Sequence, residues 1–281
     1  MMKSLFHGHL AVFCVVAWAA VGWMPRPAAA EVLLFGFETS EGYTGANGSS
    51  IANQGGWEGG GTTFTLDTTG GYQSQQSLRS SGGTGRADSP TLYSHDLDGI
   101  SLYFTNPDAY PEANVHLMRF RLQTGVPGDE DDLRRLEFHI TYTSDPSVLS
   151  LQYNIHSATA TDKRGNAAVT FSASLLDLDD WNQFRFQADF DHAGGPVYSV
   201  FLNNVQILED IAIYDTGEAD AAMRLFRLQF WAHHNGTVSA AGAVSYDRIV
   251  GYAVVPEPSV AGLVLGAGVL VMMFRHRSRR V

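Results

Sequence analysis

Phe184-Arg185-Phe186-Gln187-Ala188-Asp189-Phe190-Asp191 is the stretch that decides the fold of this 281-residue chain, because its apolar and polar side chains alternate. Successive side chains of a β-strand point to opposite faces, so the phenylalanines and the alanine share one face and the polar residues the other. The pattern predicts a half-buried strand. Its apolar face needs a second layer of structure to cover it.

The same period-two pattern recurs along the chain, and no helical pattern competes with it between the two termini. The further predicted strands are Met118 to Gln123, Leu136 to Thr143, Leu149 to His156, Val169 to Ala173 and Phe226 to Ala232. Turn-forming residues separate them, at Ser144-Asp145-Pro146, Asp162 to Asn166, Ala193 to Pro196 and Asn203-Asn204. Short strands joined by hairpins predict an all-β fold, an antiparallel β-sandwich or jelly roll.

Three stretches of this region also carry a family resemblance. They are Phe37 to Trp57 (with Phe37-Glu38, Gly42-Tyr43-Thr44 and Gln54-Gly55-Gly56-Trp57), Gly71 to Arg79, and Asp180 to Val250 (with Tyr198 to Val205 and Val244-Ser245-Tyr246-Asp247-Arg248-Ile249-Val250). Together they resemble the concanavalin A-like lectin and laminin-G type jelly roll of exported bacterial proteins. The resemblance implies the fold more than it implies binding, because lectin sugar sites lie in variable loops.

The N-terminus has the three parts of a secretory signal peptide. Lys3 supplies positive charge, Leu10 to Val21 is apolar, and Ala28-Ala29-Ala30 provides small residues before Glu31. We therefore expect residues 1–30 to be a signal helix that is cleaved between Ala30 and Glu31. An uncleaved N-terminal anchor is the alternative.

The C-terminus, residues 255–281, begins with Pro256-Glu257-Pro258, which is stiff and extended because proline restricts itself and the residue before it. Ser259 to Phe274 carries no charge, although as a helix its 16 residues reach only about 24 Å against a hydrocarbon core of about 30 Å. The basic tail 275–280 contains four arginines, which favour a cytoplasmic end under the positive-inside rule. We therefore expect a transmembrane helix at 259–274.

This order of a proline motif, an apolar helix and a basic cluster resembles the PEP-CTERM sorting signal of Gram-negative bacteria. The resemblance implies that Pro256, Glu257 and Pro258 are read by an exosortase, a membrane protease similar in role to a sortase. It implies an exported protein that is anchored in the cell membrane by its C-terminal helix and then reaches the cell surface or the extracellular matrix. A plain tail anchor is the alternative.

Charge and cysteine content narrow the role of the segment between the termini, Glu31 to Val254. Six of the 18 basic residues and one of the 29 acidic residues lie outside it, which leaves 12 against 28. Such an acidic surface repels phosphate backbones, so we expect no nucleic-acid partner. The single cysteine, Cys14, lies in the predicted signal peptide, so the mature chain has no disulfide.

Candidates for catalysis or metal binding are weak. The Glu-x-Asp-x-x-Glu pattern that glycoside hydrolases place on this jelly roll is absent, and Asp189 and Asp191 are expected to face solvent. Asp129, Glu130, Asp131 and Asp132 form an acidic loop that is a weak candidate for Ca²⁺, as is the group Asp177, Asp179 and Asp180; a plain acidic loop is favoured in both cases. No cofactor is expected, and the chain is predicted not to be an enzyme.

Aromatic residues give the remaining functional hint. Trp57, Tyr72, Tyr110 and Trp231 can stack on sugar rings when they are exposed, although in a sandwich an aromatic side chain is more often core. The favoured hypothesis is an exported, membrane-tethered surface or matrix protein with a non-catalytic carbohydrate-binding domain, whose partner is a polysaccharide. The alternatives are a polysaccharide lyase or hydrolase on the same jelly roll, and a purely structural matrix component.

Overall fold

A computed structural model describes residues 30–61, 63–80, 84–95, 97–106, 109, 113, 115–156, 163–213, 223–233 and 244–253; the side chains of 30, 84, 129–132, 154–156, 163–166 and 232–233 are not described. One compact unit spans Glu31–Val254. The predicted signal peptide and the predicted sorting signal lie outside the described residues, except that Ala30 and Glu31 begin the first strand.

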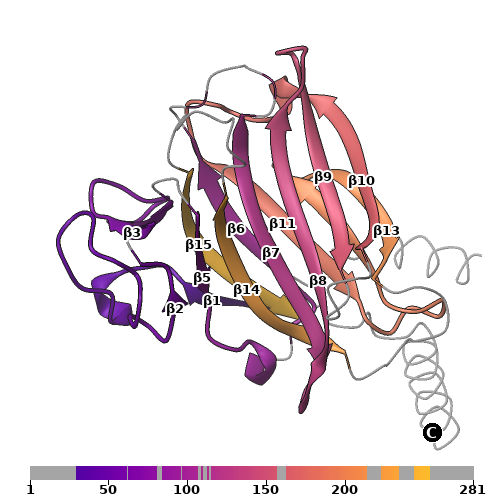
Figure 1. Ribbon diagram of the computed structural model, residues 1–281, viewed down its shortest axis with the longest axis horizontal. Helices are drawn as coiled ribbons and strands as arrows, with labels where there is room; N and C mark the ends of the chain where they lie inside the picture. The colour runs from indigo at the N-terminus through magenta and orange to yellow at the C-terminus, as the bar shows by residue number, and fades with distance from the viewer. Residues whose placement is uncertain are drawn as a thin grey trace, which may run out of the picture. The chain divides into compact units, whose positions relative to one another are not determined.

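Two antiparallel sheets make up this unit, and they lie one in front of the other in Figure 1. Sheet A runs in the order β13 (Val205–Ala212), β12 (Val197–Leu202), β11 (Asn182–Asp189), β6 (Gly99–Thr105), β15 (Val244–Ala253), β4 (Ser77–Ser80) and β3 (Phe64–Asp67), and β1 (Ala30–Phe35) also pairs with β15. Sheet B runs in the order β10 (Lys163–Ser172), β9 (Val148–His156), β8 (Asp129–Tyr142), β7 (His116–Val126), β14 (Arg224–His233), β5 (Thr84–Asp88) and β2 (Glu58–Gly59). Short 3-10 turns lie at Thr39–Glu41, Tyr93–His95 and Ala173–Leu175. The all-β, two-sheet antiparallel sandwich expected from the sequence is confirmed.

The core lies between the two sheets and is largely aromatic. Phe184 of β11 packs edge to face on Phe120 of β7, with ring centroids 4.9 Å apart, and also contacts Phe138 of β8 at 5.2 Å. The same face of β11 contributes Phe186 and Ala188, as its alternating sequence predicts. Burial of each phenylalanine removes it from water at a gain of roughly 2–3 kcal/mol, so this layer provides much of the stability.

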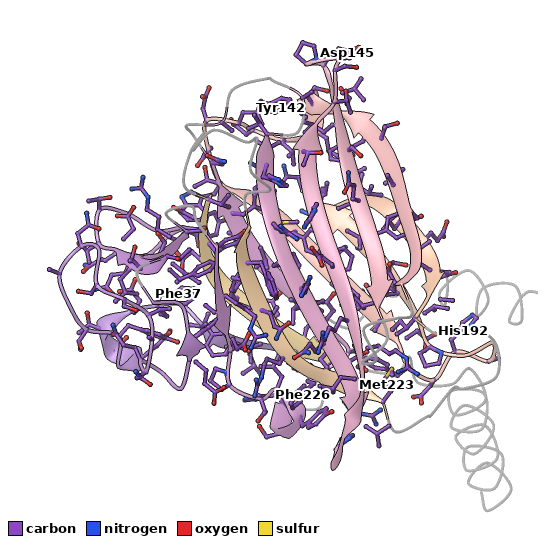
Figure 2. All side chains as sticks on the ribbon, in the orientation of Figure 1. Phe37, Tyr142, Asp145, His192, Met223 and Phe226 are labelled. Atoms are coloured by element: carbon purple, nitrogen blue, oxygen red, sulfur yellow. The ribbon has the colours of Figure 1, made fainter. Side chains whose placement is uncertain are left out.

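The loops between β1 and β5 form a second part of the same core. Figure 2 labels Phe37 among these loops, and its ring contacts Tyr43 and Trp57 at centroid distances of 5.3 and 5.9 Å. Inside this cluster the Trp57 indole N–H donates a 2.9 Å hydrogen bond to the Tyr43 hydroxyl. The indole N–H therefore has an internal partner, as a buried polar group requires.

Every predicted strand is present, and the differences lie at strand ends. The strand containing Phe184 ends at Asp189, because the Asp189 carboxylate accepts from the Asp191 N–H and starts the turn. Residues 163–166, predicted as a turn, belong to β10, which absorbs them with a register shift between Arg164 and Asn166. Such a bulge accommodates an extra residue within a strand.

The acidic segment Asp129 to Asp132 was expected to be a loop, and that prediction is wrong for its backbone. It forms the beginning of β8, because Pro127 and Gly128 already complete the turn from β7, with Gly128 at a positive φ of 89°. The side chains of Asp129, Glu130, Asp131 and Asp132 are not described, so calcium binding there stays a prediction. Across the described part of the chain, no helix has the length and apolar character needed to cross a membrane. The predicted span, 259–274, lies outside that part.

Candidate functional site

The outer face of sheet B, the face turned away from the core, carries a connected group of charged side chains. On β7, Met118, Phe120 and Leu122 are buried in the core, so Arg119 and Arg121 point outward. On β8, Phe138 is a core residue, so its neighbours Glu137 and His139 lie on the outer face, and the pairing puts Glu137 opposite Arg121 and His139 opposite Arg119. These are the strands at the front in Figure 1.

Glu137 is the centre of this group. Its Oε1 accepts hydrogen bonds from Arg119 Nη2 at 2.6 Å and Arg119 Nε at 3.1 Å, and its Oε2 accepts one from Arg121 Nε at 2.6 Å. His139 Nε2 lies 2.8 Å from Glu137 Oε1. One carboxylate thus fixes two guanidinium groups, and hydrogen bonds of this charged kind are about twice as strong as neutral ones.

The environment shifts the pKa values of the cluster. Burial alone would raise the pKa of Glu137, but hydrogen bonding from His139 and the positive charge of Arg121 outweigh it and lower that pKa well below its usual range. Burial and the nearby Arg119 charge lower the pKa of His139, although its contact with Glu137 opposes this. His139 is therefore neutral at neutral pH, while Glu137 is ionised.

Trp231 of β14 completes the group with an aromatic surface. The Arg121 guanidinium lies 4.0 Å from the centroid of the Trp231 ring, and that of Arg86 lies 5.9 Å from it. Such a cation–π contact attracts the guanidinium to the face of the ring. The Trp231 indole N–H is buried and has no hydrogen-bond partner, so one donor of this face is unused.

Five basic residues with described side chains lie on this face, and two of them, Arg86 and Arg227, are paired with Asp88 of β5. The five are Arg86, Arg119, Arg121, Arg135 and Arg227. The side chains of Arg119 and Arg121 are only 13% and 16% exposed, although they point away from the core. Partial shielding from water strengthens their attraction for an anion. The arrangement can bind a carboxylate, sulfate or phosphate group beside an aromatic ring.

The candidate residues that the sequence singled out lie in different environments of the structure. Asp189 and Asp191 are exposed, as expected, and Trp57 is a core residue, as expected. Trp231 is not in the core: it was expected there because an aromatic residue in a sandwich is more often buried between the sheets, but Phe230 takes the inward position on β14. Ala28, Tyr110 and Pro256-Glu257-Pro258 lie outside the described residues.

The second calcium candidate has a structural explanation. The Asp177 carboxylate accepts from the Asp179 N–H, and the Asp180 carboxylate accepts from the Trp181 N–H, so both stabilise the loop before β11. In the part of the chain that the structure describes, no group of three or more His, Cys, Asp or Glu residues is arranged to hold a metal ion.

Sequence reasoning missed the outer face of sheet B, although a signal was present. Arg119-Phe120-Arg121 and Glu137-Phe138-His139 both alternate polar, aromatic, polar, which predicts that each polar pair shares a face. The sequence does not give the register in which the two strands pair. Only the pairing of β7 with β8 brings the two pairs together.

No protein-family model matches this chain, and no curated protein matches it. Among solved structures it is similar to an endo-β-1,4-glucuronan lyase from the fungus Trichoderma reesei, at 14% identity over 73% of this chain and 94% of that one, with a TM-score of 0.44. It is similar to alginate lyase Aly36B at 12% identity over 80% and 97%, with a TM-score of 0.45. It is also similar to porphyranase B from Zobellia galactanivorans at 11% identity over 82% and 95%, with a TM-score of 0.46. Likeness at this level assigns no activity to the chain.

Proposed function

We propose that this chain is a non-catalytic carbohydrate-binding protein that takes an acidic polysaccharide on the outer face of sheet B. The observation that carries the proposal is the double contact of Glu137 with Arg119 and Arg121. It fixes two guanidinium groups side by side, and Arg121, which bonds to Glu137 through Nε, keeps its Nη donors for a ligand. A planar carboxylate or a sulfate group fits such donors better than a neutral hydroxyl does.

The rest of the face suits a sugar chain that carries these anionic groups. Trp231 is partly exposed and offers an apolar ring surface for the C–H groups of a sugar ring. A cluster of arginines in an otherwise acidic segment also favours an anionic partner that is attracted locally.

A second candidate function is supported by the state of His139. A neutral histidine beside two arginines has the groups needed to remove a proton from a uronic acid whose carboxylate the arginines neutralise, as a polysaccharide lyase does. The position of Nε2 argues against it, because that nitrogen is buried beside Glu137, 2.8 Å from Oε1, and is not exposed to a substrate. The non-catalytic function is therefore the one we propose.

The test is affinity electrophoresis of the full-length protein, purified in mild detergent, through gels that contain a polyuronate, a sulfated galactan or no polymer. We expect retardation by at least one acidic polymer, weakened at high salt, and a loss of about tenfold in affinity for Arg121→Gln. Arg185→Gln, on sheet A, is the matched control and should bind as the wild type does. Retardation equal in wild type and Arg121→Gln would overturn the proposed site. Release of unsaturated sugar, detected by its ultraviolet absorbance, would show instead that the protein is a polysaccharide lyase.

We also propose that the protein is exported and anchored in the membrane by residues 259–274, and that an exosortase-like protease reads Pro256-Glu257-Pro258. The order of motif, apolar segment and arginines supports this. Intact-mass measurement in the native host tests it: the wild type should lose the apolar segment and its arginines, while Glu257→Ala should keep both. Identical tails in the two proteins would leave a plain anchor.

A further inference from the structure

A second site lies on sheet A. A pocket of about 430 Å³ opens beside β1 and β15, and its lining includes Glu31, Glu38, Tyr72, Gln73 and Arg248. This volume falls in the range of about 300–1,000 Å³ that is typical of small-molecule sites. Its residues come from strands of sheet A and the loops beside them, so it does not share a side chain with the outer face of sheet B.

The ring of Tyr72 lines the pocket, and two further aromatic rings lie next to it. Tyr72 stacks on Tyr103 of β6 with ring centroids 3.6 Å apart and an angle of 9° between the planes. Trp181 stands at 64° to Tyr72, with centroids 6.4 Å apart. All three side chains are partly exposed, and the outer positions of β6 and β11 beside them are otherwise polar. Besides the Tyr72 ring, the lining includes the aliphatic side chains of Leu33 and Val250, so the pocket combines apolar surface with polar groups, as small-molecule sites do.

Hydrogen bonds hold the polar side chains of the pocket in place, and some of their oxygen atoms can still accept a hydrogen bond from a ligand. Glu38 Oε1 accepts from the backbone N–H groups of Gln75 and Gln76, at 2.8 and 3.0 Å, and Glu41 Oε2 accepts from the Gly36 N–H at 2.7 Å. The second oxygen of each carboxylate makes no hydrogen bond with a described residue, so it can accept from a hydroxyl. Arg248 Nη1 donates to Gln73 Oε1 at 2.9 Å, which orients the Gln73 amide.

We infer that this pocket and the ring next to it bind an uncharged sugar unit, with Tyr72 of the lining and the adjacent Trp181 ring against its C–H surface and the carboxylates and Gln73 on its hydroxyls. The lining has three carboxylates, those of Glu31, Glu38 and Glu41, beside the buried Asp247, and one guanidinium, that of Arg248. This excess of negative charge repels the acidic polymer proposed for sheet B. If that proposal also holds, one domain has two sugar sites on different sheets and can bridge an acidic and a neutral polysaccharide chain.

Affinity electrophoresis of the full-length protein in gels containing a soluble β-glucan, a β-mannan or a neutral galactan tests the inference. We expect retardation by at least one of them, and a loss of about fivefold or more in affinity for Tyr72→Ala and for Trp181→Ala. Tyr72→Phe keeps the ring and should bind nearly as the wild type does. Tyr72→Ala removes the ring that stacks on Tyr103, so thermal melting of each variant must show that it is folded. If Tyr72→Ala is not folded, Trp181→Ala alone tests the inference.

Reciprocal controls separate the two sites. Arg121→Gln should keep its affinity for the neutral polymer, and Trp181→Ala should keep its affinity for the acidic one, so either site can fail without the other. The absence of retardation by every neutral polymer would overturn the inference. So would a rise in melting temperature with Ca²⁺ and no sugar that Glu38→Gln abolishes, since the pocket would then be a cation site.

Discussion

The hydroxyl of Tyr246, on β15 of sheet A, bonds twice to the backbone of Arg119 on β7 of sheet B. It accepts from the Arg119 N–H at 3.0 Å and donates to the Arg119 carbonyl at 2.9 Å, and the Tyr246 ring is 2% exposed. One buried side chain therefore crosses the core and satisfies two backbone groups of the opposite sheet. Because Arg119 belongs to the candidate site, the same contact holds the strand that presents the site.

Tyr246→Phe should lower the free energy of unfolding by about 1–3 kcal/mol, because it leaves a buried N–H and a buried carbonyl without their partner. Urea unfolding measures the change. Tyr142→Phe is the control: it removes a hydroxyl from another core tyrosine, on β8, that makes no hydrogen bond with a described residue. Equal stabilities for the two variants would show that the hydroxyl of Tyr246 is not needed between the sheets.

Glu137→Gln should cost roughly 3 kcal/mol of stability, because it removes the charge that compensates two largely buried guanidinium groups. The matched control is Glu58→Gln on β2, whose carboxylate is 72% exposed and 3.8 Å from Arg227, and it should change stability by less than about 1 kcal/mol. The Glu137→Gln cost should be present above about pH 4.5, the usual pKa of a glutamate, and disappear as the pH falls toward the lowered pKa in the folded protein. A cost that is the same in acid would contradict the ion-pair explanation.

His139 predicts a second, separate dependence on pH. Its pKa in the folded protein is lowered by burial, so the folded state disfavours the protonated ring. The resulting stability is complete above about pH 6.5, the usual histidine pKa, and is lost as the pH falls through the folded value. His139→Gln should therefore flatten the loss of stability just below about pH 6.5, measured by thermal melting. A wild-type slope that persists in the variant would assign it to another group.

The sandwich was predictable because burial on one face imposes period two on a strand, and the sequences of β7, β8, β9, β11 and β14 follow it. Turn chemistry was equally readable at Asn203-Asn204, where both residues adopt a positive φ and the Asn203 side chain accepts from the Gln183 N–H at 2.8 Å. The neighbours within each sheet were not predictable. Strands β6 and β15 pair although about 140 residues separate them, and no local pattern encodes that choice.

The candidate site was less predictable for the same reason. A sequence shows that Arg121 shares a face with Arg119, but the pairing of β14 with β7 decides that Trp231 lies over Arg121. Burial was also misjudged for Trp231, since aromatic character alone does not say which sheet face a residue takes. The better guide to the face that a residue takes is its distance along the strand from a known core residue, here Phe230: an odd number of positions puts it on the opposite face.

Gly55→Ala should be destabilising by more than about 2 kcal/mol. Gly55 has a φ of 53°, and a Cβ there would lie 2.5 Å from the Tyr43 hydroxyl, which is fixed by its hydrogen bond from Trp57. Gly61→Ala is the control, because Gly61 has a φ of 50° and open space around its Cβ position, so it bears only the backbone cost of about 1–2 kcal/mol. Chemical denaturation of both variants separates the steric term from the backbone term. Equal losses would show that the loop moves to admit the methyl group.

Asp247 should make the protein more stable in mild acid relative to an asparagine variant. Burial raises the pKa of its carboxyl to about 6, although hydrogen bonds from the Ser74 hydroxyl and the N–H groups of Arg248 and Tyr72 oppose the shift. A raised pKa means that the folded state holds its proton longer than the unfolded state, so the contribution is complete below about pH 4 and lost as the pH rises through about 6. Asp247→Asn does not titrate, so its stability minus that of the wild type should increase by up to about 3 kcal/mol between about pH 4 and pH 7. Urea unfolding across that range measures the difference. A difference that stays constant or decreases would mean that the three hydrogen bonds outweigh burial and keep Asp247 charged in the folded protein.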